Sequence, residues 1–217
     1  MHHLPYQPPP QQEITPVFLD EYLLVVDKPA GLLAVPGRGA DKQDSLSSRL
    51  QAAYPDALIV HRLDMATSGL MLFARGVAMQ DKLSHLFRER EVYKRYEARV
   101  AGRLEQDAGE VDLPLGRDWP NRPKQRVDML DGKHALTRYR LLDCDVASDS
   151  SRVTLEPVTG RTHQLRVHLA ALGHPILGDA LYGDEDRAPR LLLHASELRF
   201  IHPVTGERVE CVSHAAF

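Results

Sequence analysis

The amino-acid sequence predicts an α+β fold, with a mixed, largely antiparallel central sheet flanked by helices and loops. Candidate strands outnumber candidate helices, and neighbouring strands are joined by hairpin patterns as well as by helices. The chain has 217 residues, of which 43% are hydrophobic, so it can bury the core of one compact domain or of a tightly fused pair. We expect this domain to span residues 17–217.

The first sixteen residues differ in composition from the rest of the chain. They contain five prolines and few apolar side chains, a composition that does not favour a packed core. We therefore predict a flexible, proline-rich N-terminal arm over residues 1–16. The five prolines are Pro5, Pro8, Pro9, Pro10 and Pro16.

Five elements are expected between the arm and residue 101. Asp44 and Ser45 are placed to cap a short helix that follows the first apolar strand. Apolar side chains three and four residues apart, from Met79 to Phe87, predict a second helix. In order, the elements are a strand at 22–26, a helix from 45 to about 55, a strand at 69–74, a helix ending near 90 and a strand at 92–101.

The second half contains a long proline-bearing surface loop, Gly116–Gln125, of a kind that is often functional. Thr162 is predicted to cap a third helix, in which Leu165, Leu169 and Leu172 form an apolar stripe. Strands are expected at 137–142, 153–158, 197–201 and 208–212, and the last two form a hairpin.

Cysteine usage and hydropathy indicate the compartment. Cys144 and Cys211 lie far apart and form neither a disulfide framework nor a metal motif, which suits a reducing cytosol. No secretory leader is recognisable, and no apolar run approaches the roughly 18 residues that span a bilayer. We expect a cytoplasmic protein that is not bound to membranes. No heptad pattern is visible, so we expect a monomer.

Positive charge is concentrated in two segments although the net charge is −3. Six Lys/Arg and three acids lie between Arg88 and Arg103. Arg117, Arg122, Lys124 and Arg126 form a second cluster, interrupted only by Asp118. Local excess charge of this kind can form a phosphate-binding face. Solvated charged surfaces would give the same pattern, so charge alone leaves both interpretations open.

The densest polar segment is His61–Gly69, with the sequence HRLDMATSG. Its Asp64 is a candidate nucleophile, because a carboxylate can attack a sugar anomeric carbon or an electrophilic pyrimidine carbon. An aspartate in a turn more often caps backbone N–H groups, and spacing alone favours that role. Hydrolysis of a glycosidic bond usually needs a second carboxylate, and none is evident beside Asp64. Transfer of the base back to the same sugar needs only one.

The second dense segment is Gly160–His168, with the sequence GRTHQLRVH. Arg166 falls on the flank of the predicted apolar stripe, roughly 100° from Leu165. A guanidinium at that position can form a bidentate pair with a carboxylate and keep it ionised. A surface arginine on an amphipathic helix remains the alternative.

Metal and nucleotide cofactors are not expected. His163 and His168 are five residues apart and do not share a helix face, and no cysteine or carboxylate completes a ligand set with His174. The HExxH, GxGxxG, P-loop and GxSxG patterns are absent. Tyr96, beside Lys94 and Arg95, is either a core aromatic or a ring on which an RNA base stacks.

Four segments together resemble one family. The chain resembles the RluA-type pseudouridine synthases in four segments, which occur in the same order: HRLDMATSGL, KRY, RTHQLRVHLAALGHPILGD and LLLHASELRF. The resemblance covers the chain from about Val17 onward. One departure is Val35–Pro36, where many members of the family have His-Pro.

The resemblance implies the pseudouridine synthase catalytic fold over residues 17–217, without the S4 domain that precedes it in larger relatives. It implies an isomerase that converts specific uridines of 23S rRNA and tRNA anticodon stem-loops to pseudouridine by base flipping. Asp64 matches the catalytic aspartate and Arg166 the arginine that pairs with it. Tyr96 matches the aromatic that packs on the uracil, and Arg62 the side chain that fills the space left by the flipped base.

Two other functions compete with this interpretation. A catalytically inactive RNA-binding module or RNA chaperone of the same fold would have lost Asp64, Tyr96 or Arg166, and all three are present. A nucleosidase would release free uracil. The order of bond changes stays open, since Asp64 could attack C1′, attack C6 or remove a sugar proton.

Overall fold

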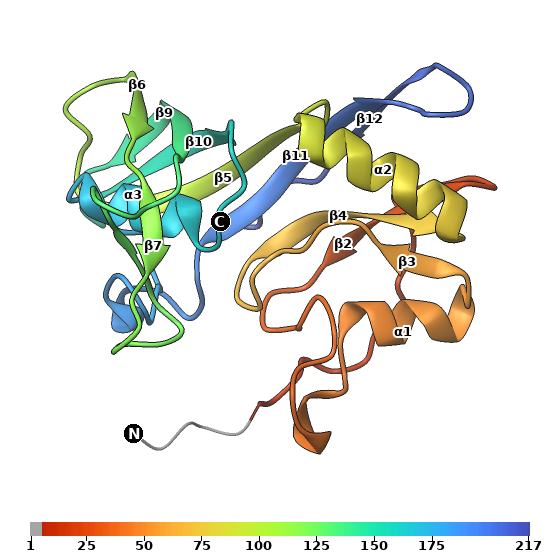
Figure 1. Ribbon diagram of the computed structural model, residues 1–217. Helices are drawn as coiled ribbons and strands as arrows, with labels where there is room; N and C mark the ends of the chain where they lie inside the picture. The colour runs from red at the N-terminus through yellow and green to blue at the C-terminus, as the bar shows by residue number, and fades with distance from the viewer. Residues whose placement is uncertain (1–5) are drawn as a thin grey trace. The chain divides into compact units, whose positions relative to one another are not determined.

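The computed structural model describes residues 6–217 (Figure 1). The chain divides into two compact units, each built around strands. Unit 1 contains the described residues up to Tyr93 together with Ala195–His214. Unit 2 contains Lys94–His194 and the last residues, Ala215–Phe217.

Unit 1 is built on strands whose hydrogen-bonded order is β1-β2-β4-β11, with β3 also paired to β4 and β12 to β11. The pairs β1/β2, β2/β4, β3/β4 and β11/β12 are all antiparallel. The elements are β1 (Phe18–Leu19), β2 (Leu23–Lys28), η1 (Ala40–Lys42), α1 (Leu46–Ala53), β3 (Ala57–Ile59), β4 (Ser68–Arg75), α2 (Val77–Glu89), β11 (Leu193–Ile201, from Ala195 onward) and β12 (Arg208–Val212).

Both faces of the unit 1 sheet are covered. Leu23 and Val25 of β2 pack in one core with Met79 and Leu83 of α2. Successive strand residues point to opposite faces, so Leu24, also fully buried, faces the other side. Figure 1 shows α1 and α2 on opposite sides of these strands. Coverage of both faces explains why β2 is a continuous apolar run rather than an alternating one.

Unit 2 contains a second set of antiparallel strands in the order β5-β10-β9-β6, and a separate hairpin of β7 and β8. Its one α-helix within the described residues, α3, packs against β8, β9 and β10. The elements are β5 (Tyr93–Ala101, from Lys94 onward), β6 (Ala108–Asp112), β7 (Leu115–Arg117), β8 (Gln125–Val127), β9 (Leu136–Asp145), β10 (Ser150–Pro157), α3 (Gln164–Ala171) and η2 (Glu185–Arg187).

The predicted fold class, an α+β fold on a mixed, largely antiparallel sheet, is confirmed. The predicted cap of α1 is also correct, because the Ser45 hydroxyl accepts the N–H of Ser48 in a capping box. Among residues 6–217, no helix is long and apolar enough to cross a membrane.

The predicted start of the third helix is wrong. Thr162 does not cap it; α3 begins at Gln164 after His163, whose backbone is left-handed with φ 53°. The Gln164 side chain instead organises the preceding turn, where its Oε1 accepts the N–H of Arg161 and the hydroxyl of Thr159. Leu172 lies at the C-terminal cap and is 38% exposed, so it is not part of a buried stripe.

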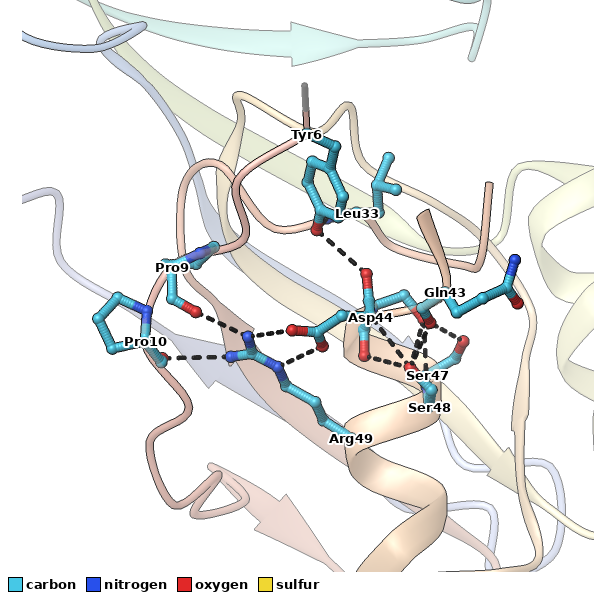
Figure 2. A network of polar contacts seen from close by, with 10 residues as sticks. Tyr6, Pro9, Pro10, Leu33, Gln43, Asp44, Ser47, Ser48 and Arg49 are labelled. Atoms are coloured by element: carbon cyan, nitrogen blue, oxygen red, sulfur yellow. Dashed lines mark hydrogen bonds and ion pairs between the residues drawn. The ribbon is translucent and has the colours of Figure 1, made fainter. Parts of the chain in front are cut away.

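The described part of the N-terminal segment contacts α1 (Figure 2). The Tyr6 hydroxyl donates to the Asp44 carbonyl and accepts the N–H of Leu33, at 3.1 and 3.0 Å. The Arg49 guanidinium donates to the carbonyls of Pro9 and Pro10 and forms a bidentate pair with the Asp44 carboxylate. Residues 1–5 of the predicted arm lie outside the described residues. The flexibility of residues 6–16 stays a prediction, because hydrogen bonds alone do not measure motion.

We predict that Arg49→Ala lowers the free energy of unfolding by about 2 kcal/mol, because it leaves a carboxylate and two carbonyls without their charged donor. The Arg49 side chain is only 7% exposed. Urea denaturation measures the change. The matched control is Arg88→Ala, since Arg88 is 69% exposed and bonds only within α2; its expected change is within about 0.5 kcal/mol. Equal, small changes for both variants would contradict a structural role for the Arg49 contacts.

Candidate active site

Asp64 and Arg62 lie on the loop of unit 1 that connects β3 to β4. Leu63 between them is buried, whereas Arg62 is exposed and Asp64 is half-buried. The N–H of Thr67 donates to the Asp64 carbonyl at 3.1 Å, which closes a turn immediately after Asp64. The loop therefore buries Leu63 and leaves the two predicted functional side chains accessible.

The buried ammonium of Lys28 anchors this loop. Its Nζ donates to the carbonyls of Pro29, Leu32 and Met65 at 2.9, 2.8 and 3.0 Å. The N–H of Gly31 donates to the same Met65 carbonyl at 2.9 Å. An ammonium has three donors, so these three carbonyls satisfy it fully. Because Met65 follows Asp64 directly, Lys28 fixes the backbone next to the candidate nucleophile.

Burial lowers the pKa of Lys28 from 10.5 to about 7, and the negative charges of Asp64 and Asp27 act in the opposite direction. The attraction between Lys28 and Asp64 is thus part of the electrostatics of the loop. Lys28 is fully buried at the end of β2, where its backbone lies opposite Gly69 of β4.

Two contacts place the strand that follows the loop. Gly69 has φ +111°, and a Cβ there would overlap the backbone of Ala195, so only glycine fits. His61 Nε2 accepts the N–H of Leu72 at 2.9 Å, and its ring stacks on Phe87 with centroids 4.4 Å apart. His61 and Gly69 of the first polar segment therefore have structural roles within unit 1.

Arg166 lies on α3 in unit 2 and pairs with Asp179. Its Nε and Nη2 donate to the two carboxylate oxygens at 2.8 and 2.7 Å. The side chains are 6% and 0% exposed. Arg166 is therefore a buried, oriented guanidinium, and its interpretation as a surface arginine is wrong.

The Asp179 carboxylate is held ionised by its donors. Burial acts to raise its pKa, but the hydrogen bond and charge of Arg166 and the N–H groups of Leu181 and Tyr182 outweigh burial. The pKa of Asp179 consequently lies below its ordinary value. The two N–H bonds, at 2.9 and 3.2 Å, also fix the turn that carries Tyr182.

Tyr182 connects Arg166 to the β7–β8 hairpin. The Arg166 guanidinium lies 5.2 Å from the centroid of the Tyr182 ring. The Tyr182 hydroxyl accepts the N–H of Gln125 at 2.7 Å and shares a 2.6 Å hydrogen bond with Nδ1 of His163. Arg166, its carboxylate and the start of β8 thus form one connected cluster.

Tyr96 lies in the middle of β5, opposite Leu155 of β10, and is half-buried. The structure therefore places Tyr96 and Arg166 in unit 2, and Arg62 and Asp64 together on one loop of unit 1. The predicted pairing of Asp64 with Arg166 joins residues of different units and stays a prediction.

Each of the three histidines considered as metal ligands has another hydrogen-bond partner. His163 bonds Tyr182, His174 bonds the Ala101 carbonyl, and His168 bonds Thr137 and the Leu113 carbonyl. Among residues 6–217, no group of three or more His, Cys, Asp or Glu side chains could hold a metal ion.

Sequence reasoning assigned no role to Lys28, Asp179 or Tyr182. Lys28 follows closely on the apolar run Leu23–Val26, which was a signal for a buried ammonium, because lysine is rarely buried without partners. Asp179 ends the segment HPILGD, directly after a glycine with φ +71°. Nothing in the sequence pointed to Tyr182.

We predict that Asp179→Asn lowers the free energy of unfolding at pH 7 by about 3–5 kcal/mol, because it removes the buried carboxylate that forms the bidentate pair with the guanidinium of Arg166. The lowered pKa of Asp179 stabilises the fold above its unfolded pKa, near 4, and this stabilisation is lost as pH falls through the folded pKa. The variant and the wild type should therefore converge in acid.

Urea denaturation across pH measures both effects. The control is Glu105→Gln, which removes an exposed acid of the same unit. A loss for Asp179→Asn that is no larger than the control's, or that persists undiminished in acid, would show that the pair is not a buried ionic interaction.

Comparisons with known proteins agree on one family. The family described as RNA pseudouridylate synthase matches residues 22–171. A dual-specificity RNA pseudouridine synthase RluA of Escherichia coli O6:H1 is 48% identical over 215 residues, which cover 98% of this chain and 98% of the relative. The RluA of Vibrio parahaemolyticus is 50% identical over 209 residues, covering 94% and 84% of the two chains.

Solved structures give the same result. Human RNA Pseudouridylate Synthase Domain Containing 1 is 32% identical, with a TM-score of 0.78 over 96% of this chain and 86% of that chain. Human RNA Pseudouridylate Synthase Domain Containing 4 is 28% identical, with a TM-score of 0.74 over 92% of this chain and 88% of that chain. The chain belongs to the RNA pseudouridylate synthase family, in its RluA-type branch, and is an isomerase that forms pseudouridine in RNA.

Proposed function

We propose that this enzyme isomerises specific uridines in both 23S rRNA and tRNA anticodon stem-loops, with Asp64 as its catalytic residue. The observation that carries the proposal is the near full-length similarity to synthases named for dual specificity. A stem-loop shared by two RNAs is a short, locally folded target. Such a target suits a domain that reads RNA with its own loops.

The local geometry supports the role of Asp64. Its carboxylate is half-buried on a loop whose backbone is fixed by Lys28 and Gly31 at the neighbouring residue. A reacting carboxylate benefits from such fixed placement, since misplacement by about 1 Å can cost two orders of magnitude in rate. Attack at C1′, attack at C6 and removal of a sugar proton all use this carboxylate.

We propose that Arg166 pairs with Asp64 and keeps it ionised and oriented. The bidentate pair with Asp179 uses Nε and Nη2 of the guanidinium. Fixation by Asp179 makes Arg166 a rigid partner rather than a mobile one. Lysine lacks the planar fork, so Arg166→Lys would not preserve both pairs.

Arg62 and Tyr96 are assigned to different steps. Arg62 is exposed and two residues from Asp64, which suits a side chain that replaces the extruded uridine in the RNA stack. Tyr96 is half-buried on a strand, which suits a fixed ring that stacks on the uracil. Its hydroxyl is assigned to accept the C5 proton, directly or through water.

The two cysteines bear on the compartment in which the enzyme acts. Cys144 and Cys211 are both free, and burial raises the pKa of the Cys211 thiol to about 11, which makes it unreactive. Two free thiols suit a reducing cytoplasm. We propose that the enzyme acts there as a monomer and without a metal or organic cofactor.

We predict that Asp64→Ala and Asp64→Asn abolish isomerisation and leave RNA affinity within about tenfold, because the carboxylate is a reactant whereas phosphate contacts dominate affinity. Tritium release from 5-tritiated uridine in an anticodon stem-loop measures turnover. The control is Asp81→Asn, an exposed acid on α2, which should retain full activity. Turnover above about 1% of wild type in both Asp64 variants would rule out the assignment, and free uracil as product would indicate a nucleosidase.

We predict different defects for Arg62 and Tyr96. Arg62→Ala should slow reaction on a structured stem-loop more than on a short flexible RNA, because flipping is nearly free in the latter. Tyr96→Phe should bind RNA normally but release tritium more slowly. Single-turnover kinetics on both RNAs, with 2-aminopurine beside the target, measures these effects. Equal losses for Arg62→Ala on both RNAs, or full speed for Tyr96→Phe, would remove the corresponding role.

A further inference from the structure

The loop between β7 and β8 carries the only tryptophan of the chain, and this side chain is exposed. Trp119 is 58% exposed, although tryptophan side chains are on average highly buried. The Arg122 guanidinium carbon lies 3.8 Å from the centroid of its ring, and that of Arg117 lies 5.5 Å away. The indole and these two guanidinium groups form the cluster that we call the Trp119 platform.

The positive charge of the Trp119 platform is not neutralised within the protein. No carboxylate among residues 6–217 forms an ion pair with Arg117 or Arg122. In the same hairpin, only Arg126 has an acidic partner, Asp128, at 3.2 Å. An exposed aromatic ring beside unpaired guanidinium groups has the chemistry of a nucleotide site, because bases stack on the ring and phosphates pair with the cations.

The loop is held in a defined conformation by its own backbone. The N–H of Asp118 donates to the Lys124 carbonyl, and that of Lys124 donates to the Asn121 carbonyl, at 3.1 and 3.0 Å. Asn121 in turn donates from its backbone and its side chain to Asp118. The platform is thus presented on a closed turn, and little conformational entropy is lost when a ligand binds.

The hairpin is also attached to the support of Arg166. The N–H of Gln125, the first residue of β8, donates to the Tyr182 hydroxyl, and the Arg166 guanidinium lies over the Tyr182 ring. All these residues belong to unit 2. The platform is therefore fixed relative to the arginine assigned to the catalytic carboxylate, so it is placed to recognise substrate rather than to bind independently.

We propose that the Trp119 platform binds an unpaired nucleotide of the substrate RNA other than the target uridine. The base stacks on the indole or on the Arg122 plane, and its phosphate pairs with Arg117 or Arg122. This inference rests on the proposed function, because the ligand is the loop of a stem-loop RNA substrate. A paired helix does not offer a free base face, so the platform distinguishes loops from duplexes.

The chain's single tryptophan gives a direct test. Titration of the wild-type enzyme with an anticodon stem-loop RNA should quench Trp119 emission, with the same dissociation constant that anisotropy of the labelled RNA reports. A blunt duplex with the sequence of the stem should bind without quenching. Binding of the stem-loop with unchanged Trp119 emission would overturn the proposal.

Variants test the energetics. Trp119→Ala should weaken stem-loop binding by about 5- to 100-fold, the range that stacking of one base supplies. Trp119→Phe should remain within about threefold of wild type because it keeps a stacking ring. The loss should appear mainly in KM rather than in the single-turnover rate at saturating RNA. The control is Leu130→Ala, which removes an apolar side chain that is 94% exposed in the turn after β8.

The charges make a separate contribution. Arg117→Gln together with Arg122→Gln should reduce the slope of log affinity against log salt by about 0.7 for each phosphate that the protein no longer neutralises. An unchanged slope and a Trp119→Ala affinity equal to that of Leu130→Ala would overturn the proposal, and would favour a protein as the partner of the exposed ring. Quenching by a stem-loop that is never isomerised would support the platform and contradict the proposed substrate.

Discussion

The buried ion pair between Arg166 and Asp179 is the interaction on which the arrangement of unit 2 depends. Two buried charges are stable only when their remaining donors and acceptors are satisfied, and Asp179 meets this condition with the N–H groups of Leu181 and Tyr182. The same turn places the Tyr182 ring beneath the guanidinium and its hydroxyl on β8. One ion pair therefore orients the arginine that we propose as the partner of Asp64, closes a turn and positions the hairpin that carries Trp119.

Unit 1 also contains a buried cation, the ammonium of Lys28. An ammonium in the interior requires acceptors, and the three carbonyls that supply them belong to two segments, residues 29–32 and the loop at Met65, which Lys28 links. The cost of burial is visible in the pKa of Lys28, which falls to about 7. In both units a buried cation fixes irregular backbone: Lys28 fixes the loop next to Asp64, and Arg166 fixes the turn at Asp179. Arg62 and Arg122, which we propose to contact the bases and phosphates of the RNA, are by contrast exposed.

Local signals predicted α1 and α2 well, because their causes lie within a few residues, whereas the short strands β1, β3, β6, β7 and β8 were not predicted. Ser45 caps α1 through Ser48, and the spacing of Met79 and Leu83 predicted α2. The start of α3 was predicted wrongly because the side chain of Gln164, rather than that of Thr162, organises the turn. The site residues came from the family resemblance, and spacing alone favoured other roles for Asp64 and Arg166. Lys28 and Asp179 were missed because each has a partner far along the chain, the Met65 carbonyl for Lys28 and the Arg166 side chain thirteen residues away for Asp179.

Mapping of pseudouridine at nucleotide resolution in cellular RNA tests the central claim most directly. Cells that lack this enzyme are compared with cells complemented by the wild type or by Asp64→Asn. The account predicts that specific sites in 23S rRNA and in tRNA anticodon stem-loops lose pseudouridine in the deletion. It also predicts that the wild type restores them and Asp64→Asn does not. Unchanged sites in the deletion, or full restoration by Asp64→Asn, would contradict the account.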